Sequence, residues 1–307
     1  PYTFKDDLDT GMFNISNANL GFSVGGTEHF RIATDGSLST PTLGTSNVRF
    51  GVNAGNSIAS GGNYNTVVGD EAGTALTTGD GNVAVGFEAL KTEDAHGRNT
   101  AMGYQALKTL NAGAEGVTTT IGYQAGTSLT TGVQNTLIGG LSGDALTDAD
   151  YNVAVGNNTL SSDTKGSKSV AIGYEALVSQ NFSTSTDSFN VAMGFQAGAA
   201  VTTGVQNTLI GGLAGDALTT GQANTALGYE ALGATTTANG NVGAGYRSLV
   251  ANTTGAANTG IGTNALVANT TASNNVAVGY DSLKANTTGD GNTAVGQGSL
   301  DANTTAD

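Results

Sequence analysis

Hydrophobic and polar positions alternate in short stretches that recur along most of the chain. In the stretch NVAVGFEAL (82–90), Asn82 and Ala84 alternate with Val83 and Val85. Alternation with a period of two is typical of a β-strand, because successive side chains of a strand point to opposite faces. One face would carry β-branched, apolar and aromatic residues, and the other would carry Asn, Ala and Gly. Because the second face is small rather than charged, we expect another segment to pack closely against it as well.

The glycine in this stretch, Gly86, marks a repeat that occurs in fifteen copies. Eleven of the fourteen intervals between these reference glycines are 17 residues long, and the others are 18, 19 and 21. Thirteen copies have Asn four residues before the glycine, every copy has Val or Thr three before it, and eight have an aromatic residue directly after it. The reference glycines are Gly51, Gly69, Gly86, Gly103, Gly122, Gly139, Gly156, Gly173, Gly194, Gly211, Gly228, Gly245, Gly262, Gly279 and Gly296.

Each repeat is long enough for two short strands and two turns, and its ends, such as TTGDGN (77–82), are rich in turn-forming residues. A single coil cannot bury its own face, so the coils must stack on one another. Neighbouring coils would pair about 4.8 Å apart and make a rod of roughly 70 Å, with the Asn column as a ladder of side-chain amides. We therefore predict an all-β fold: a β-solenoid or β-roll over residues 47–307, preceded by a small β-rich segment over residues 1–46 with a turn at Asp35 and Gly36.

The apolar volume of the repeat moves between two positions. Six copies have Gly four residues after the reference glycine, and all six have an aliphatic residue three positions later. The other nine copies have Leu at the earlier position, and of these only the copy with Leu107 keeps a second one, Leu110. Close-packed interiors require this kind of compensation, because both voids and overpacking reduce stability. The exchange predicts one continuous core shared by the coils.

The repeat core resembles sequences of two related families. The segments that carry the resemblance are NTAMGYQAL (99–107), SVAIGYEAL (169–177) and NVAVGYDSL (275–283). They are similar to the repeat region of bacteriophage tail fibres and to the β-roll head of trimeric autotransporter adhesins, and the 17-residue period fits the phage fibres better. The resemblance covers residues 47–307.

This resemblance implies a parallel homotrimer that forms a stiff, non-enzymatic rod for host attachment. The expected location is the virion, with tail or baseplate proteins and a host cell-surface receptor, a glycan or an outer-membrane component, as partners. A trimeric adhesin on a bacterial surface is the alternative.

Composition narrows the classes of partner. The chain has 24 acidic and 10 basic residues and a formal net charge of −14, which disfavours nucleic acid because phosphate binding needs clustered Lys and Arg. No apolar run has the length of a membrane span, and the absence of Cys excludes disulfide and thiolate chemistry. The chain starts at Pro1 without a signal-like segment and stops at Asp307 inside a repeat, so we expect it to be part of a longer protein.

Residues that could carry chemistry have structural interpretations beside the functional ones. The glycines of GDGNVAVGFEAL (79–90) are spaced somewhat like a phosphate loop, but the pattern recurs in every copy without a following helix, which favours a scaffold role. Glu71 and Glu88 would stack about 5 Å apart, near the separation found in retaining glycosidases, yet a surface column of carboxylates gives the same spacing. His29 and His96 are isolated histidines. We therefore expect no enzymatic activity, no cofactor and no metal site.

Two further features remain candidates. Nine copies have a Thr pair eight and nine residues after the glycine, five of them consecutive from Thr236 to Thr305. Flat Thr arrays on β-solenoids are typical of ice-binding proteins, although only one Thr of each adjacent pair can point to a given face. The long insertion at residues 180–190 contains Phe182 and Phe189, which could contact a receptor or pack against the rod.

Overall fold

The computed structural model describes residues 2–4, 7–14, 20–32, 38–40 and 43–307, and this part of the chain contains strands and turns but no helix. The chain divides into two compact units, Pro1–Val117 and Thr118–Asp307. None of the residues that the structure describes forms a helix long and apolar enough to span a membrane. The two units are described separately.

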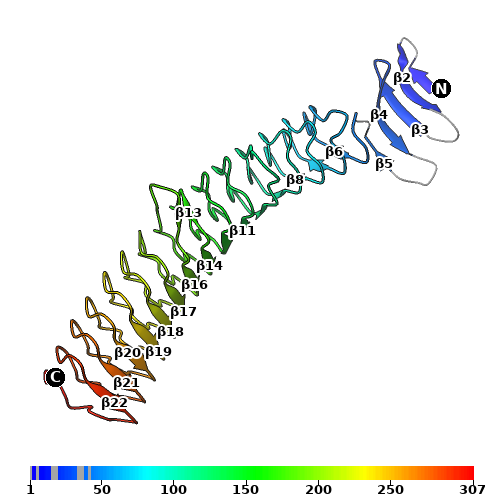
Figure 1. Ribbon diagram of the computed structural model, residues 1–307. Helices are drawn as coiled ribbons and strands as arrows, with labels where there is room; N and C mark the ends of the chain where they lie inside the picture. The colour runs from blue at the N-terminus through cyan, green and yellow to red at the C-terminus, as the bar shows by residue number, and fades with distance from the viewer. Residues whose placement is uncertain (1, 5–6, 15–19, 33–37, 41–42) are drawn as a thin grey trace. The chain divides into compact units, whose positions relative to one another are not determined.

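The first unit begins with an antiparallel sheet of five strands that follow one another in chain order (Figure 1). These strands are β1 (Tyr2–Phe4), β2 (Asp7–Asn14), β3 (Leu20–Val24), β4 (Thr27–Ile32) and β5 (Leu38–Ser39). Gly25 and Gly26 connect β3 to β4, and their φ angles of 58° and 74° suit a tight hairpin. The predicted β-rich segment is therefore present, whereas the predicted turn at Asp35 and Gly36 lies outside the described residues.

Fifteen three-residue strands, one for each copy of the repeat, form the coils. In the first unit they are β6 (Val48–Phe50), β7 (Thr66–Val68), β8 (Val83–Val85) and β9 (Thr100–Met102). In the second unit they are β10 (Thr119–Ile121), β11 (Thr136–Ile138), β12 (Val153–Val155), β14 (Val170–Ile172), β16 (Val191–Met193), β17 (Thr208–Ile210), β18 (Thr225–Leu227), β19 (Val242–Ala244), β20 (Thr259–Ile261), β21 (Val276–Val278) and β22 (Thr293–Val295). Within each unit, neighbouring strands pair in parallel and in register, as in Val153 opposite Val170. The predicted parallel β-solenoid is confirmed.

Most coils contain one regular strand, not the two predicted. The rest of the coil turns through residues with positive φ, which interrupt any second strand. Two positions in the repeat have this conformation: the second residue after the reference glycine and the leucine at the fourth. After Gly86, for example, Glu88 has a φ angle of 53° and Leu90 one of 49°. Main-chain hydrogen bonds still connect the coils there, as from Leu90 N–H to Ala106 O at 3.0 Å. A leucine with positive φ is unfavourable by itself, so the packing between coils must stabilise this backbone conformation.

The reference glycine is required by its backbone and by its neighbour. Gly86 has a φ of 133°, and a Cβ atom built on it would lie 2.3 Å from the carbonyl oxygen of Gly103 in the next coil. The same contact recurs at most other reference glycines, for example at 2.5 Å between Gly211 and Gly228, whereas Gly296 in the last coil has open space. The glycine therefore allows the main chains of adjacent coils to approach closely, as the scaffold interpretation predicts.

The face with small residues is the inside of the coil. The middle residue of the strand is buried in coils such as those of Ala154 and Leu209, whereas the first and third residues are half-buried or exposed. The Asn four residues before the glycine also points inside. Asn207, for example, is 0% exposed; its Oδ1 accepts the N–H of Asn224 at 3.0 Å, and its Nδ2 donates to Gly221 O at 2.9 Å. The predicted amide ladder is present.

The exchange of apolar volume is explained by contacts inside the coil. A Cβ on Gly143 would lie 2.8 Å from Leu146 and 3.0 Å from Leu137, so those two side chains occupy the space that Leu fills in other coils. Conversely, Gly243 lies where a Cβ would be 3.2 Å from Leu232, a leucine of the preceding coil. Each coil thus fills one interior of nearly constant volume in one of two ways.

The two longest insertions lengthen turns, as predicted. Residues 111–117 precede β10, and residues 180–189 contain the short strand β15 (Thr186–Asp187), which pairs in parallel with β13 (Gly166–Ser167). Figure 1 shows β13 on the side of the second unit opposite its coil strands. The 180–189 insertion is therefore an ordered extension of the stack.

Candidate functional site

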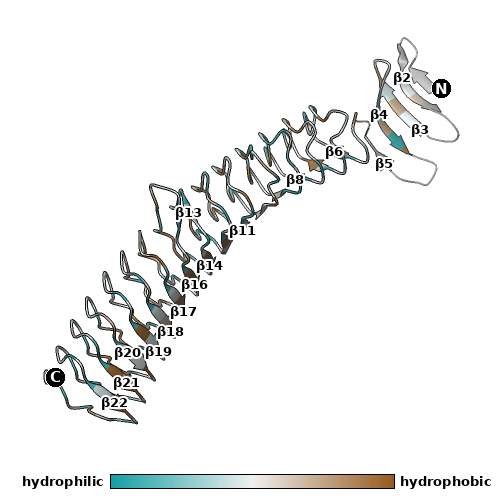
Figure 2. Ribbon diagram, in the orientation of Figure 1, coloured by the Kyte–Doolittle hydropathy of each residue, from teal (hydrophilic) through white to brown (hydrophobic). Residues whose placement is uncertain are grey.

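The outward side of the coil strands in the second unit is apolar and incompletely covered. We call it the apolar strand face and define it as the apolar third residue of each strand and the aromatic residue after the glycine. Its members are Ile121, Tyr123, Ile138, Val155, Ile172, Tyr174, Met193, Phe195, Ile210, Leu227, Tyr229, Tyr246, Ile261, Val278, Tyr280 and Val295. Figure 2 shows hydrophobic residues on the coil strands along this side. The face contains no charged residue.

The exposure of this face is large for such apolar side chains. Leu227 is 50% exposed, Ile261 is 43% exposed and Tyr246 is 50% exposed. The aromatic rings stack along the face in pairs from adjacent coils, with centroids 5.5 Å apart for Tyr174 and Phe195. An apolar stripe that repeats at every coil is the kind of surface that marks an interaction site.

The two phenylalanines of the 180–190 insertion have different environments. Phe182 is 6% exposed, and its main-chain N–H donates to Asp163 Oδ1 at 3.2 Å, so its ring packs against the stack. Phe189 is 51% exposed, and Lys168 Nζ lies 5.3 Å from its ring centroid. Lys168 also pairs with Asp187 at 2.5 Å. Of the two residues, only Phe189 is therefore exposed.

Glu71 and Glu88 form an ion-pair network with lysines. Lys91 Nζ donates to both carboxylates, at 2.6 Å for Glu88, and Lys108 Nζ lies 2.6 Å from Glu88. Hydrogen bonds from Lys108 and Lys91 lower the pKa of Glu88 to about 2. A retaining glycosidase pairs one protonated carboxyl group with one ionised carboxylate, and the lowered pKa of Glu88 would fit only the ionised one. The spacing of this pair is explained by charge pairing.

The two threonines of each pair point in different directions. The first one bonds to the next coil, as from Thr219 Oγ1 to Thr236 O at 3.0 Å. The second one is exposed in seven consecutive coils: Thr203, Thr220, Thr237, Thr254, Thr271, Thr288 and Thr305. A single row of exposed threonines, one for each coil, is therefore available, as the alternation argument predicts.

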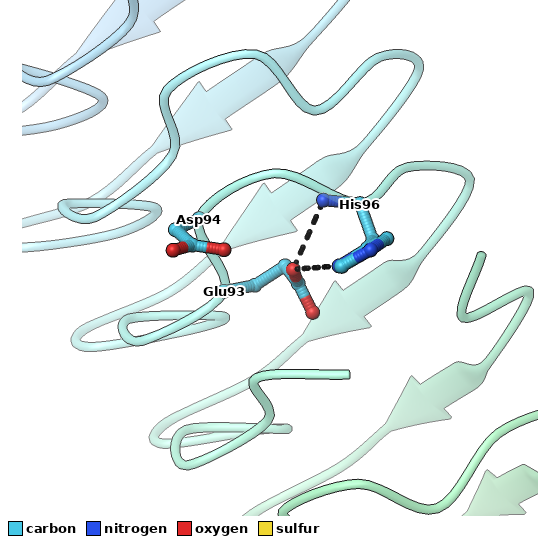
Figure 3. A group of neighbouring side chains, drawn as sticks. All are labelled: Glu93, Asp94 and His96. Atoms are coloured by element: carbon cyan, nitrogen blue, oxygen red, sulfur yellow. Dashed lines mark hydrogen bonds and ion pairs between the residues drawn. The ribbon is translucent and has the colours of Figure 1, made fainter. Parts of the chain in front are cut away.

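A third group of side chains escaped the sequence reasoning. His96 is not isolated, because it lies in one turn with Glu93 and Asp94, and ligand atoms of all three lie within 4.8 Å of one another (Figure 3). The signal was readable in EDAH (93–96), which replaces the LTTG (76–79) of the preceding coil. The expectation that no metal site exists considered histidines alone, although carboxylates also bind metals. His29 lies apart from this group, exposed on β4.

Glu93 is fully buried, and its side chain has a structural role because it accepts main-chain hydrogen bonds. Its Oε1 accepts the main-chain N–H of His96 at 3.1 Å, and its Oε2 accepts that of Ala112 at 3.0 Å. These bonds fix the turn to the next coil. His96 Nδ1 lies 3.4 Å from Glu93 Oε1 and has no hydrogen-bond partner.

Comparison of the chain with protein-family models, with curated proteins and with solved structures found no match in any of the three. The functional argument therefore starts from the fold and from these surfaces.

Proposed function

We propose that the chain is a segment of a structural fibre in which three parallel copies associate through the apolar strand face into a stiff stalk. The observation that carries this proposal is the repetition of that face in the coils of the second unit. A solenoid with a hydrophobic outer stripe on one side needs a partner with the same spacing, and another copy of the same chain has it.

The free energy available from this face is sufficient for association. Complete burial of a Leu or Ile side chain contributes about 1.5–3 kcal/mol, so covering one that is half exposed contributes about 1 kcal/mol. Leu227 and Ile261 are exposed to this extent. Five third residues of the second unit and its six aromatic residues after the glycine are exposed to about this extent. Together these side chains would supply about 10 kcal/mol per chain, which is comparable with the cost of association.

The role that fits such a stalk best is a bacteriophage tail fibre, as the resemblance of the repeat implies. The stalk would connect tail or baseplate proteins to a surface that binds a host receptor, and Phe189 on the insertion is the candidate contact within this chain. The same stalk would serve a bacterial surface adhesin. Genes for tail proteins beside the gene for this chain would favour the phage role, and genes for a membrane anchor would favour the adhesin.

The row of exposed threonines supports a second candidate function, ice binding. It places one hydroxyl on each coil at the spacing of the solenoid, from Thr203 to Thr305. Thermal hysteresis of the purified chain tests this directly. A solution that shows no hysteresis would dismiss ice binding and leave the fibre proposal intact.

The mass of the purified chain in solution tests the fibre proposal, measured by light scattering after size-exclusion chromatography. We expect three times the mass of one chain. The double variant Leu227→Glu, Ile261→Glu should run as a monomer, because it places charges within the apolar strand face. The matched control Thr237→Glu, Thr254→Glu adds the same charge at exposed turn positions and should remain a trimer. A monomeric unmodified chain would overturn the proposal.

A further inference from the structure

The turn at residues 93–96 brings three metal-binding side chains into a small space. Figure 3 shows Glu93, Asp94 and His96 on the same turn after β8, with Glu93 beside His96. His96 Nδ1 and Glu93 Oε1 are 3.4 Å apart. Two ligands of a tetrahedral Zn²⁺, each about 2.0–2.1 Å from the ion, are about 3.3–3.4 Å apart. The pair therefore already has the separation that such an ion requires.

The nitrogen that would bind the ion has no hydrogen-bond partner. His96 Nδ1 is shielded from solvent and has no hydrogen-bond partner, although the ring itself is partly exposed. Buried polar atoms of this kind are normally satisfied, and a site for an ion is one standard reason for an exception. Because Nδ1 lies next to a buried carboxylate oxygen, a cation between them would satisfy both atoms.

A second buried carboxylate shows what is unusual about Glu93. Asp163 has the corresponding position in its own coil, seven residues after the reference glycine, and is equally buried. It accepts three main-chain N–H groups, from residues 165, 166 and 182, and the side chain of Gln180 at 2.6 Å. Glu93 accepts two main-chain N–H groups and has a second carboxylate, Asp94, beside it. Since buried negative charge is costly without compensation, the turn of Glu93 lacks the compensation that Asp163 has.

We propose that this turn binds one divalent transition-metal ion of the Zn²⁺ type. Glu93 and Asp94 would each supply a carboxylate oxygen, His96 would supply Nδ1, and water would fill the fourth position. A mixed set of imidazole and carboxylate ligands suits Zn²⁺ and its neighbours better than Ca²⁺, which prefers oxygen ligands only. The ion would fasten a turn that already bonds to both neighbouring coils, through Asp94 O to the preceding one and Glu93 Oε2 to the next. This inference does not depend on the proposed fibre function.

Titration of the full-length chain with Zn²⁺, after removal of bound metal with a chelator, tests the site. We expect one Zn²⁺ per chain by calorimetry, and a Co²⁺ spectrum with the strong visible bands of a tetrahedral site. His96→Ala should weaken Zn²⁺ binding by at least about 100-fold, and Asp94→Asn should weaken it as well. Both residues are partly exposed, so these variants should keep the strand signal in circular dichroism.

The matched control is His29→Ala, which removes the other histidine and should leave Zn²⁺ binding unchanged. Absence of a stoichiometric site in the unmodified chain would overturn the proposal. Equal Zn²⁺ affinity of the His96→Ala variant would do the same, because histidine would then not be a ligand. Ca²⁺ binding as tight as Zn²⁺ binding would also overturn the proposal, because it would indicate a site made of carboxylates alone.

Discussion

The ladder of buried asparagines gives the sharpest quantitative test of how the coils are held together. Asn207 makes four hydrogen bonds with its side chain. Its Oδ1 accepts the N–H of Asn224 at 3.0 Å and Nδ2 of the same residue at 3.2 Å. Its Nδ2 donates to Gly221 O at 2.9 Å and to Asn190 Oδ1 at 3.3 Å. The variant Asn207→Ala removes all four bonds without adding charge or volume.

The cost of this substitution follows from which groups lose their partners. Nδ2 of Asn224 keeps its bond to Ala238 O, and Asn190 Oδ1 keeps the main-chain N–H of residue 207. The N–H of Asn224 and the carbonyl of Gly221 would be left buried without these partners. Each such group costs about 1–3 kcal/mol, so we expect a loss of about 4 kcal/mol.

Hydrogen exchange measured by mass spectrometry is the suitable assay, because arrays of repeats do not unfold in a single step. A loss of about 4 kcal/mol should speed exchange in peptides that cover residues 205–226 by about 10³-fold. Thr220→Ala, at an exposed position next to Gly221 in the following coil, is the control and should change exchange little. Equal exchange rates in the two variants would mean that the ladder contributes nothing to stability, and would refute this reasoning.

Five other substitutions test three separate parts of the fold. Gly86→Ala should destabilise the chain severely, since its Cβ would lie 2.3 Å from a carbonyl oxygen of the next coil, whereas Gly81→Ala has open space and should cost about 1 kcal/mol in thermal unfolding. The pKa of Glu88 is lowered to about 2, so its ion pairs should stabilise the fold above pH 4.5 and be lost as the pH falls toward 2. Glu88→Gln should flatten that part of the stability profile, and an unchanged slope would contradict this assignment. Phe182→Ala should lower stability by about 3 kcal/mol, whereas Phe189→Ala should change it by less than about 1 kcal/mol; equal losses would show that both rings are packed.

Much of the architecture could be predicted from the sequence because the repeat displays the same constraint many times. The glycine at the reference position and the asparagine four residues before it recur because each has one possible geometry in the stack. The repeat did not show, however, that a second strand is missing from most coils. Such a strand is prevented by left-handed residues such as Leu90, and leucine carries no sequence signal for that conformation.

The sequence also did not determine which of the two strand faces points into the coil. Alternation separates the small side from the β-branched and aromatic side, but it does not say which one is inside. The structure places the small side inside because the coil is narrow: Ala154 is 0% exposed, whereas Val153 and Val155 flank it on the outside. The β-branched and aromatic side therefore lies outside, where it forms a candidate interface.

Of the candidate sites, the sequence predicted the insertion but not the group of Glu93, Asp94 and His96. The insertion with Phe182 and Phe189 stands out in sequence as a break in the period, but only coordinates distinguish the buried ring from the exposed one. The group of Glu93, Asp94 and His96 was missed because each residue is unremarkable alone. All three differ from the residues at the same positions in the preceding coil, and that combination is visible only when the copies are aligned.

The position of Glu93 follows from how the coils fill their interior. A coil with Gly four residues after the reference glycine places an aliphatic side chain at the seventh position, as with Leu146. Of the nine coils with Leu at the fourth position, only that of Leu107 has a second large apolar side chain at the seventh position, Leu110, and in the other eight the seventh position is polar. Buried polar groups there need partners, and Asn269 finds them by bonding to the asparagine of the preceding coil at 2.9 Å. Where the residue is an acid instead, the same position needs N–H donors or a cation, so the choice of apolar packing in a coil determines where the solenoid can hold charge inside.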